Sequence, residues 1–138
     1  MKKISSYHKI SFLWLGPNPG ESLKKLFVEF KRLKLIDNNT RFIDLNKAFQ
    51  GKNLSEIKKK INWIGSFRLL IWTIDRFNHK QFIQDELCYR WSQLKGTFQI
   101  KGKEIEINRS SKESHKIMTT LNPPKGSTDI DIFIRNLY

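Results

Sequence analysis

The chain has 138 residues, 38% of them hydrophobic and including ten Phe and four Trp, which suits one packed domain or two small units that share a core. No apolar run reaches the roughly 18–20 residues of a membrane span, and the single cysteine excludes an intrachain disulfide or a multi-cysteine metal site. The net charge of +13 and the pI of about 10.0 indicate an electrostatic partner such as nucleic acid or an anionic surface.

The positive charge is concentrated in the first half of the chain, where residues 1–60 hold 14 Lys/Arg against five Asp/Glu. Residues 1–9 are interpreted as a basic arm, since they lack the continuous apolar stretch of a signal peptide. We therefore expect a cytoplasmic protein without a membrane partner.

A short strand, a turn and two helices are predicted next. Residues 10–15 are β-prone, and the Gly-Pro-Asn-Pro-Gly sequence at 16–20 is a strong turn signal. Glu21 then opens a helix with an apolar stripe at Leu23, Leu26, Phe27, Phe30 and Leu33. After a turn at 37–40, whose Asn39 or Thr40 can cap the next helix, that short helix ends at Gly51. Its inward residues are expected to be Phe42, Leu45 and Phe49, and its outward residues Arg41, Asp44 and Lys47.

The same arrangement starts again after a basic connector at 52–60. Trp63 lies 49 residues after Trp14, and Phe98 lies 49 residues after Phe49. The two helical stripes align at an offset of 44 instead, so small insertions must separate these landmarks. The second stripe consists of Phe67, Leu70, Ile71, Ile74 and Phe77, and the helix after it carries Leu87, Trp91, Leu94 and Phe98. We interpret the pattern as an internal duplication, with one unit at 10–59 and a second at 60–109.

The pattern changes after Phe98. Alternation over 98–107, with Gly102 at the turn, predicts a β-hairpin. Residues 110–138 are expected to form a helical extension, with one helix through about 121 and a last one from 127. Alternating Ile residues in the last segment would also fit a strand, but its apolar spacing favours a helix. The predicted fold is therefore α+β and mainly helical, with two tandem winged-helix-like units.

Two helices joined by a short turn and followed by a hairpin are the arrangement of a winged helix-turn-helix. In that arrangement the second helix lies in the DNA major groove and the hairpin touches the backbone. Arg and Asn suit base edges, while Lys suits phosphates. The residues expected to bind DNA are Arg41, Asn46, Lys47, Lys52, Lys58, Lys59, Lys60, Arg90, Gln93, Lys95, Lys101 and Lys103.

Other interpretations fit the same residues. The Lys-rich face could serve solubility or an acidic partner in a protein-interaction module, and the second unit could instead be a packing or dimerisation element, with a homodimer or a protein partner. RNA binding is disfavoured because the aromatic residues fall on buried stripes, where Trp14 and Trp63 serve as core anchors. Asp85 and Glu86 would repel phosphate, so the first unit is expected to carry most of the DNA binding.

No catalytic constellation is evident. The three His residues, His8, His79 and His115, belong to no recognised nucleophile or zinc motif. Asp129 and Asp131 are interpreted as first-turn residues of the last helix, and a phosphate-binding Gly-rich loop is lacking. We expect no enzyme activity, cofactor, metal or small-molecule substrate.

The segment Lys60-Ile61-Asn62-Trp63-Ile64-Gly65-Ser66, its Leu/Ile-striped helix and the Phe-x-Ile-x-Gly-Lys sequence from Phe98 resemble part of RteC-type proteins. These proteins are regulators carried on conjugative elements of Bacteroides and its relatives. The resemblance covers about residues 60–107 and, more faintly, 10–56. It implies a winged-helix DNA-binding protein that takes part in transcription regulation or mobile-element transfer, and it implies no catalytic residue.

Overall fold

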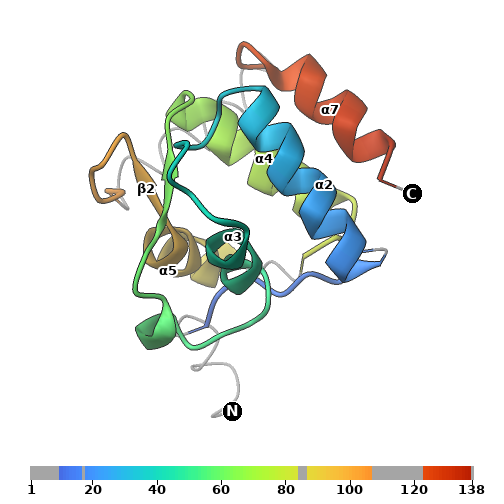
Figure 1. Cartoon of the computed structure of the whole chain (residues 1–138). Helices are drawn as coiled ribbons and strands as arrows, with labels where there is room; N and C mark the ends of the chain where they lie inside the picture. Colours follow the sequence, from blue (N-terminus) through green and yellow to red (C-terminus); the bar gives the residue numbers. More distant parts are fainter. Residues whose placement is uncertain (1–9, 17, 84–86, 107–122, 138) are drawn as a thin grey trace.

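A computed structural model describes residues 10–16, 18–83, 87–106 and 123–137, with the backbone alone for 87–90. The predicted arm at 1–9 and the predicted helix at 110–121 lie outside these residues. The described part is an α+β fold, as predicted (Figure 1). Its α-helices are α2 (Pro19–Arg32), α3 (Phe42–Ala48), α4 (Phe67–His79), α5 (Leu87–Thr97) and α7 (Ser127–Arg135). A short 3-10 turn, η2 (Leu54–Glu56), and two strands, β1 (Ile61–Trp63) and β2 (Phe98–Ile100), complete it. None of the described helices combines the length and the apolar character needed to cross a membrane.

Helix α4 is the most buried helix, and its burial exceeds the predicted stripe. Ser66 caps its start, because the Ser66 hydroxyl accepts the Leu69 N–H at 3.1 Å. Leu69 and Trp72, outside the predicted stripe, are buried as well. Helix α7 packs on α4 and covers this second face, and the Trp72 indole N–H donates to an Asp131 carboxylate oxygen at 2.9 Å. The helix prediction for α7 is confirmed, because Ile130 and Ile134 are buried at helical spacing.

The two Trp-x-Gly segments make reciprocal contacts across the fold. Trp14 forms a bridge with Ile83, and the Leu15 N–H donates to the Phe82 carbonyl at 2.6 Å. In the other half, Trp63 forms a bridge with Ile36, and the Ile64 N–H donates to the Leu35 carbonyl at 2.7 Å. Each segment therefore pairs with the chain that follows the first helix of the opposite half.

The indole rings repeat this exchange. Trp14 meets Phe77 of α4 edge-on at 5.4 Å, and Trp63 meets Phe30 of α2 edge-on at 5.4 Å. Phe77 lies 47 residues after Phe30, so these two ring contacts have an offset of 47, whereas the predicted alignment of the helical stripes has an offset of 44. Since the Trp landmarks are offset by 49, the first half holds two extra residues between Trp14 and Phe30, a stretch that includes the Pro-rich turn at 16–20.

The halves differ in how their strands pair. Phe12 to Trp14 runs antiparallel to the chain after α3, with Leu13 opposite Gln50. Strand β1 instead runs parallel to β2, with Ile61 opposite Phe98. Strand β1 therefore lies between β2 on one side and the bridge at Ile36 on the other.

The chain after β2 reverses tightly, as the predicted turn at Gly102 requires. Ile100 and Lys103 exchange two backbone hydrogen bonds of 2.8 and 2.9 Å. Lys101 and Gly102 between them have φ of 50° and 81°, the left-handed conformations of a two-residue type I′ turn. The structure assigns no strand from 101 to 106, so the described part of the predicted hairpin is this single bridge.

Candidate nucleic-acid interface

Asn62 joins two distant turns at one edge of the fold. It lies on β1 between the buried Ile61 and Trp63, so its side chain points to the opposite face. The Asn62 amide N–H donates to an Asp37 carboxylate oxygen at 3.2 Å, and the Asn62 side-chain oxygen accepts the Gly102 N–H at 2.7 Å. Sequence reasoning missed this residue, although a lone polar side chain in a buried strand was an available signal.

The basic connector lies against the same edge. The Lys60 ammonium is 2.6 Å from a Glu104 carboxylate oxygen. This contact lowers the pKa of Glu104 below its usual value, and the charge of Lys95 contributes in the same direction. The ion pair therefore joins the end of the connector at 57–60 to the chain just after the turn at 101–102, about 40 positions later.

Two adjoining grooves result, and Glu104 lines both. We call the first the basic groove, with a volume of about 470 Å³. It is lined by Asp37, Asn39, Thr40, Ile57, Lys58, Lys59, Lys60, Asn62, Gln99 and Glu104. The second groove has a volume of about 340 Å³ and carries Lys101 and Lys103 on its wall. Five of the predicted DNA-binding lysines therefore surround one edge of the molecule.

The anionic groups at this edge are already engaged. The Asp37 carboxylate accepts the Asn39 backbone N–H at 2.7 Å and the Asn62 amide. These bonds, helped by the charges of Lys31 and Lys59, lower the pKa of Asp37. The Asp37 carboxylate therefore lines the basic groove with its oxygens already accepting hydrogen bonds from the protein.

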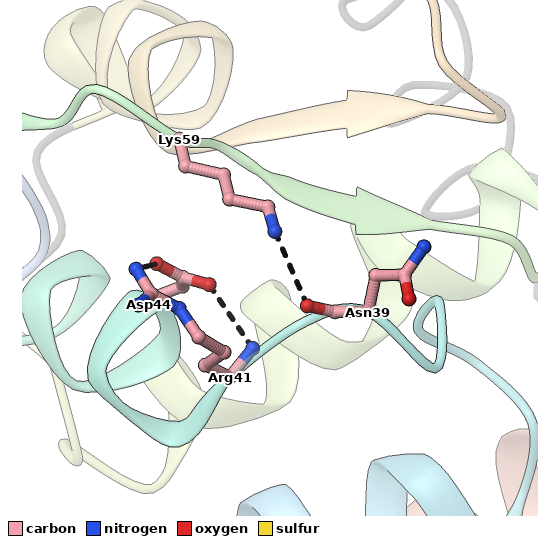
Figure 2. A network of polar contacts seen from close by, with 4 residues as sticks. All are labelled: Asn39, Arg41, Asp44 and Lys59. Atoms are coloured by element: carbon pink, nitrogen blue, oxygen red, sulfur yellow. Dashed lines mark hydrogen bonds and ion pairs between the residues drawn. The ribbon is translucent and has the colours of Figure 1, made fainter.

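The cations are less completely engaged. Figure 2 shows the Lys59 ammonium reaching across to the Asn39 backbone carbonyl, at 3.2 Å, and Lys59 forms no ion pair among the described residues. Within the part of the chain that the structure describes, Lys58, Lys101 and Lys103 have no ion-pair partner. These four ammonium groups remain able to bind an external anion.

Arg41 lies at the start of α3 but is tied to its own helix. The Arg41 backbone N–H donates to one Asp44 carboxylate oxygen at 3.0 Å, and its guanidinium lies 3.3 Å from the other (Figure 2). Asp44 is only 5% exposed, so the prediction that it faces outward is wrong. Its carboxylate caps the N-terminal end of α3, where the helix dipole favours a negative charge.

Three other predicted residues of the first unit lie apart from the basic groove. Asn46 and Lys52 line a groove of about 430 Å³ beside the start of α2. The Lys47 carbonyl accepts the Ser11 hydroxyl at 2.8 Å, so its backbone holds the segment at 10–14. The structure thus divides the predicted first-unit residues into two separate surfaces.

The prediction that Gln93 presents a base-reading amide is wrong. Its side chain is 3% exposed, and its N–H donates to the Ser11 carbonyl at 3.3 Å. Helix α5 turns this face toward the segment at 10–14, while Gly96 packs against Leu54 of η2. Lys95 on the same helix is exposed, and the Arg90 side chain lies outside the described residues.

Among the described residues, no three His, Cys, Asp or Glu side chains gather in a way that could hold a metal ion. Comparisons with protein-family models, with curated proteins and with solved structures found no match to this chain.

Proposed function

We propose that the chain binds duplex DNA through the basic groove and the adjoining turn at 101–103. The observation that carries the proposal is that Asn62 and the Lys60–Glu104 ion pair bring two lysine clusters together. Neither lysine cluster by itself indicates a DNA-binding site, since a run such as Lys58 to Lys60 is often only a solvated surface. Their convergence places four lysines that form no ion pair among the described residues at one edge of a chain whose net charge is +13.

The contacts expected at this edge are to phosphates. Lysine ammonium groups act as point charges and position a duplex without reading its sequence. The tight turn at 101–102 would then touch the backbone, as the hairpin of a winged helix does. In this proposal Gln93 has no role in base recognition, because it is buried. Arg41 has a reduced role, because its guanidinium contacts the Asp44 carboxylate.

The finer proposal is that this DNA binding serves a regulator of transcription or of a mobile element. The resemblance of residues 60–107 to RteC-type regulators supports it, as does the exposed turn that follows β2. Two tandem winged-helix-like units remain part of this proposal, and a structure of the complex with DNA would test them.

A salt titration tests the proposal most directly. The affinity for a 20-base-pair duplex should fall with salt, with a log–log slope of up to about −3.6 for four neutralised phosphates at ~0.9 each. The double variant Lys58→Ala/Lys59→Ala should reduce the magnitude of that slope by about 1.8. Fluorescence anisotropy with labelled duplex at several salt concentrations measures both.

The matched control removes the same charge elsewhere. Lys80→Ala/Lys125→Ala changes two exposed lysines that line neither groove. If this control variant lowers the affinity as much as the Lys58/Lys59 variant, binding is diffuse and the assigned edge is wrong. Absence of duplex binding at low salt would refute DNA binding outright, and tighter binding to duplex RNA would make RNA the ligand.

A further inference from the structure

A second surface, independent of the basic groove, lies between α2 and α7. Figure 1 shows α7 beside α2, and residues of both helices line a groove of about 390 Å³. Val28 of α2 faces Phe133 across it, while the charge of Arg32 reaches Asp129 at the other end of the pair. The two helices therefore run antiparallel, and the groove lies between them along part of their length.

The wall of this groove is apolar. Val28 is 63% exposed, and Phe133 of α7 and Leu137, two residues beyond the end of α7, line the same groove. Ile132 is 48% exposed and lies four residues before Asn136, which lines the groove. Residues four apart are neighbours on a helix, so Ile132 extends the apolar surface next to the groove. Single exposed apolar residues are ordinary, but an apolar wall between two helices marks a place where a third helix can pack.

The rim of the groove is positive. Lys24 and Lys25 line one end, are exposed, and have no ion-pair partner among the described residues. Glu29 is the acidic residue of the lining, and Arg32 holds its carboxylate through two bonds of 2.9 and 2.5 Å. The same contact lowers the pKa of Glu29, so its negative charge is compensated within α2.

We propose that this groove docks an amphipathic helix of a partner protein, with apolar residues facing Val28 and Phe133 and acidic residues facing Lys24 and Lys25. Charge complementarity selects the acidic partner, and a second copy of this strongly basic chain would be repelled. Helix α2 has 14 residues and is about 21 Å long, at 1.5 Å per residue. The partner helix would therefore present about three to four turns. The proposal does not depend on DNA binding.

A synthetic peptide provides the test. The probe is a 16-residue helix-forming peptide with Leu at i, i+3, i+4 and i+7 and Glu at the flanking positions. It should bind the whole chain with a dissociation constant on the order of 10–100 μM, measured by isothermal titration calorimetry. Val28→Asp should weaken this binding by about tenfold or more, because a carboxylate would enter the apolar wall. Lys24→Ala/Lys25→Ala should weaken it by several-fold and reduce its salt dependence.

Matched variants and peptides decide the outcome. Ile43→Asp makes the same change at an aliphatic side chain on α3 that is 49% exposed, and it should leave peptide binding unchanged. A scrambled peptide of the same composition, or one with Lys in place of Glu, should bind at least tenfold more weakly. The proposal is overturned if either peptide binds equally well, if Val28→Asp has no effect, or if no acidic peptide binds. It is also overturned if light scattering shows a dimer that Val28→Asp dissolves, since the occupant would then be a second copy.

Discussion

Alanine substitutions at Gly16 and Gly65 test the reciprocal packing of the two halves. A Cβ atom at Gly16 would lie 2.9 Å from the Phe82 ring and 3.0 Å from two carbons of the Trp14 indole. A Cβ atom at Gly65 would lie 2.7 Å from a Leu35 methyl and 3.2 Å from the Trp63 indole nitrogen. All of these distances are shorter than the ~3.5–4.0 Å at which carbon atoms attract one another.

The two sites differ in how easily their neighbours can yield. Beside Gly16, the Trp14 indole is held by the rings of Phe77 and Phe82, whose centroids lie 5.4 and 5.2 Å away. Beside Gly65, the nearest atom is the end of the flexible Leu35 side chain. Gly16→Ala should therefore lower the free energy of unfolding by about 2–3 kcal/mol and Gly65→Ala by about 1–2 kcal/mol.

Gly20→Ala is the control, because a Cβ atom at Gly20 meets no heavy atom within 4 Å. Gly20 lies in the first turn of α2, where alanine should raise stability by up to about 0.5–1 kcal/mol. Urea unfolding followed by tryptophan fluorescence measures all three variants. The packing argument is refuted if Gly16→Ala is neutral, or if the two motif glycines respond in the same direction as Gly20.

Two further predictions concern polar contacts. Asp131→Ala should lower the free energy of unfolding by about 1–2 kcal/mol, because it leaves the buried Trp72 indole N–H without its acceptor. Asp131→Asn, which keeps an acceptor oxygen, should cost less than half as much in the same urea assay, and equal losses would contradict this role. The Lys60–Glu104 pair lowers the pKa of Glu104 in the folded state, so its contribution is present above the ordinary value of 4.5 and is lost as the pH falls through the lowered pKa. Glu104 is 62% exposed, so solvent screening limits this contribution to below about 1 kcal/mol. Glu104→Gln should abolish that part of the stability loss between about pH 5 and pH 3. If the free energy of unfolding of Glu104→Gln falls with pH as steeply as that of the unsubstituted chain, the pair contributes nothing.

Local sequence patterns predicted the helices well. The apolar spacing of α2, α4 and α7 is a property of consecutive residues, and the structure has helices at all three places. The start of α2 falls two residues earlier than predicted, because Pro19 suits the first turn of a helix. The tight turn at Gly102 was predictable for the same local reason.

The candidate site was predicted only in part. The lysines of the connector and of the turn at 101–103 were visible as exposed charge, but their convergence depends on β1 pairing with β2. Gln93 and Asp44 were wrongly placed on the surface, since helical spacing does not show which further segment covers a polar side chain. Asn62 was missed because its role arises from two turns that lie 25 and 40 residues away.

The sequence by itself determined the helical periods, the turn chemistry and the two Trp-x-Gly landmarks. These depend on each residue and its near neighbours. Only the tertiary structure decided that each Trp segment pairs with the opposite half, that β1 and β2 run parallel, and that two lysine clusters share one edge. Strand pairing and burial join residues that are distant in the chain. A pattern of period 2 or 3.6 predicts a strand or a helix, but it does not indicate which other segment that element pairs with or packs against.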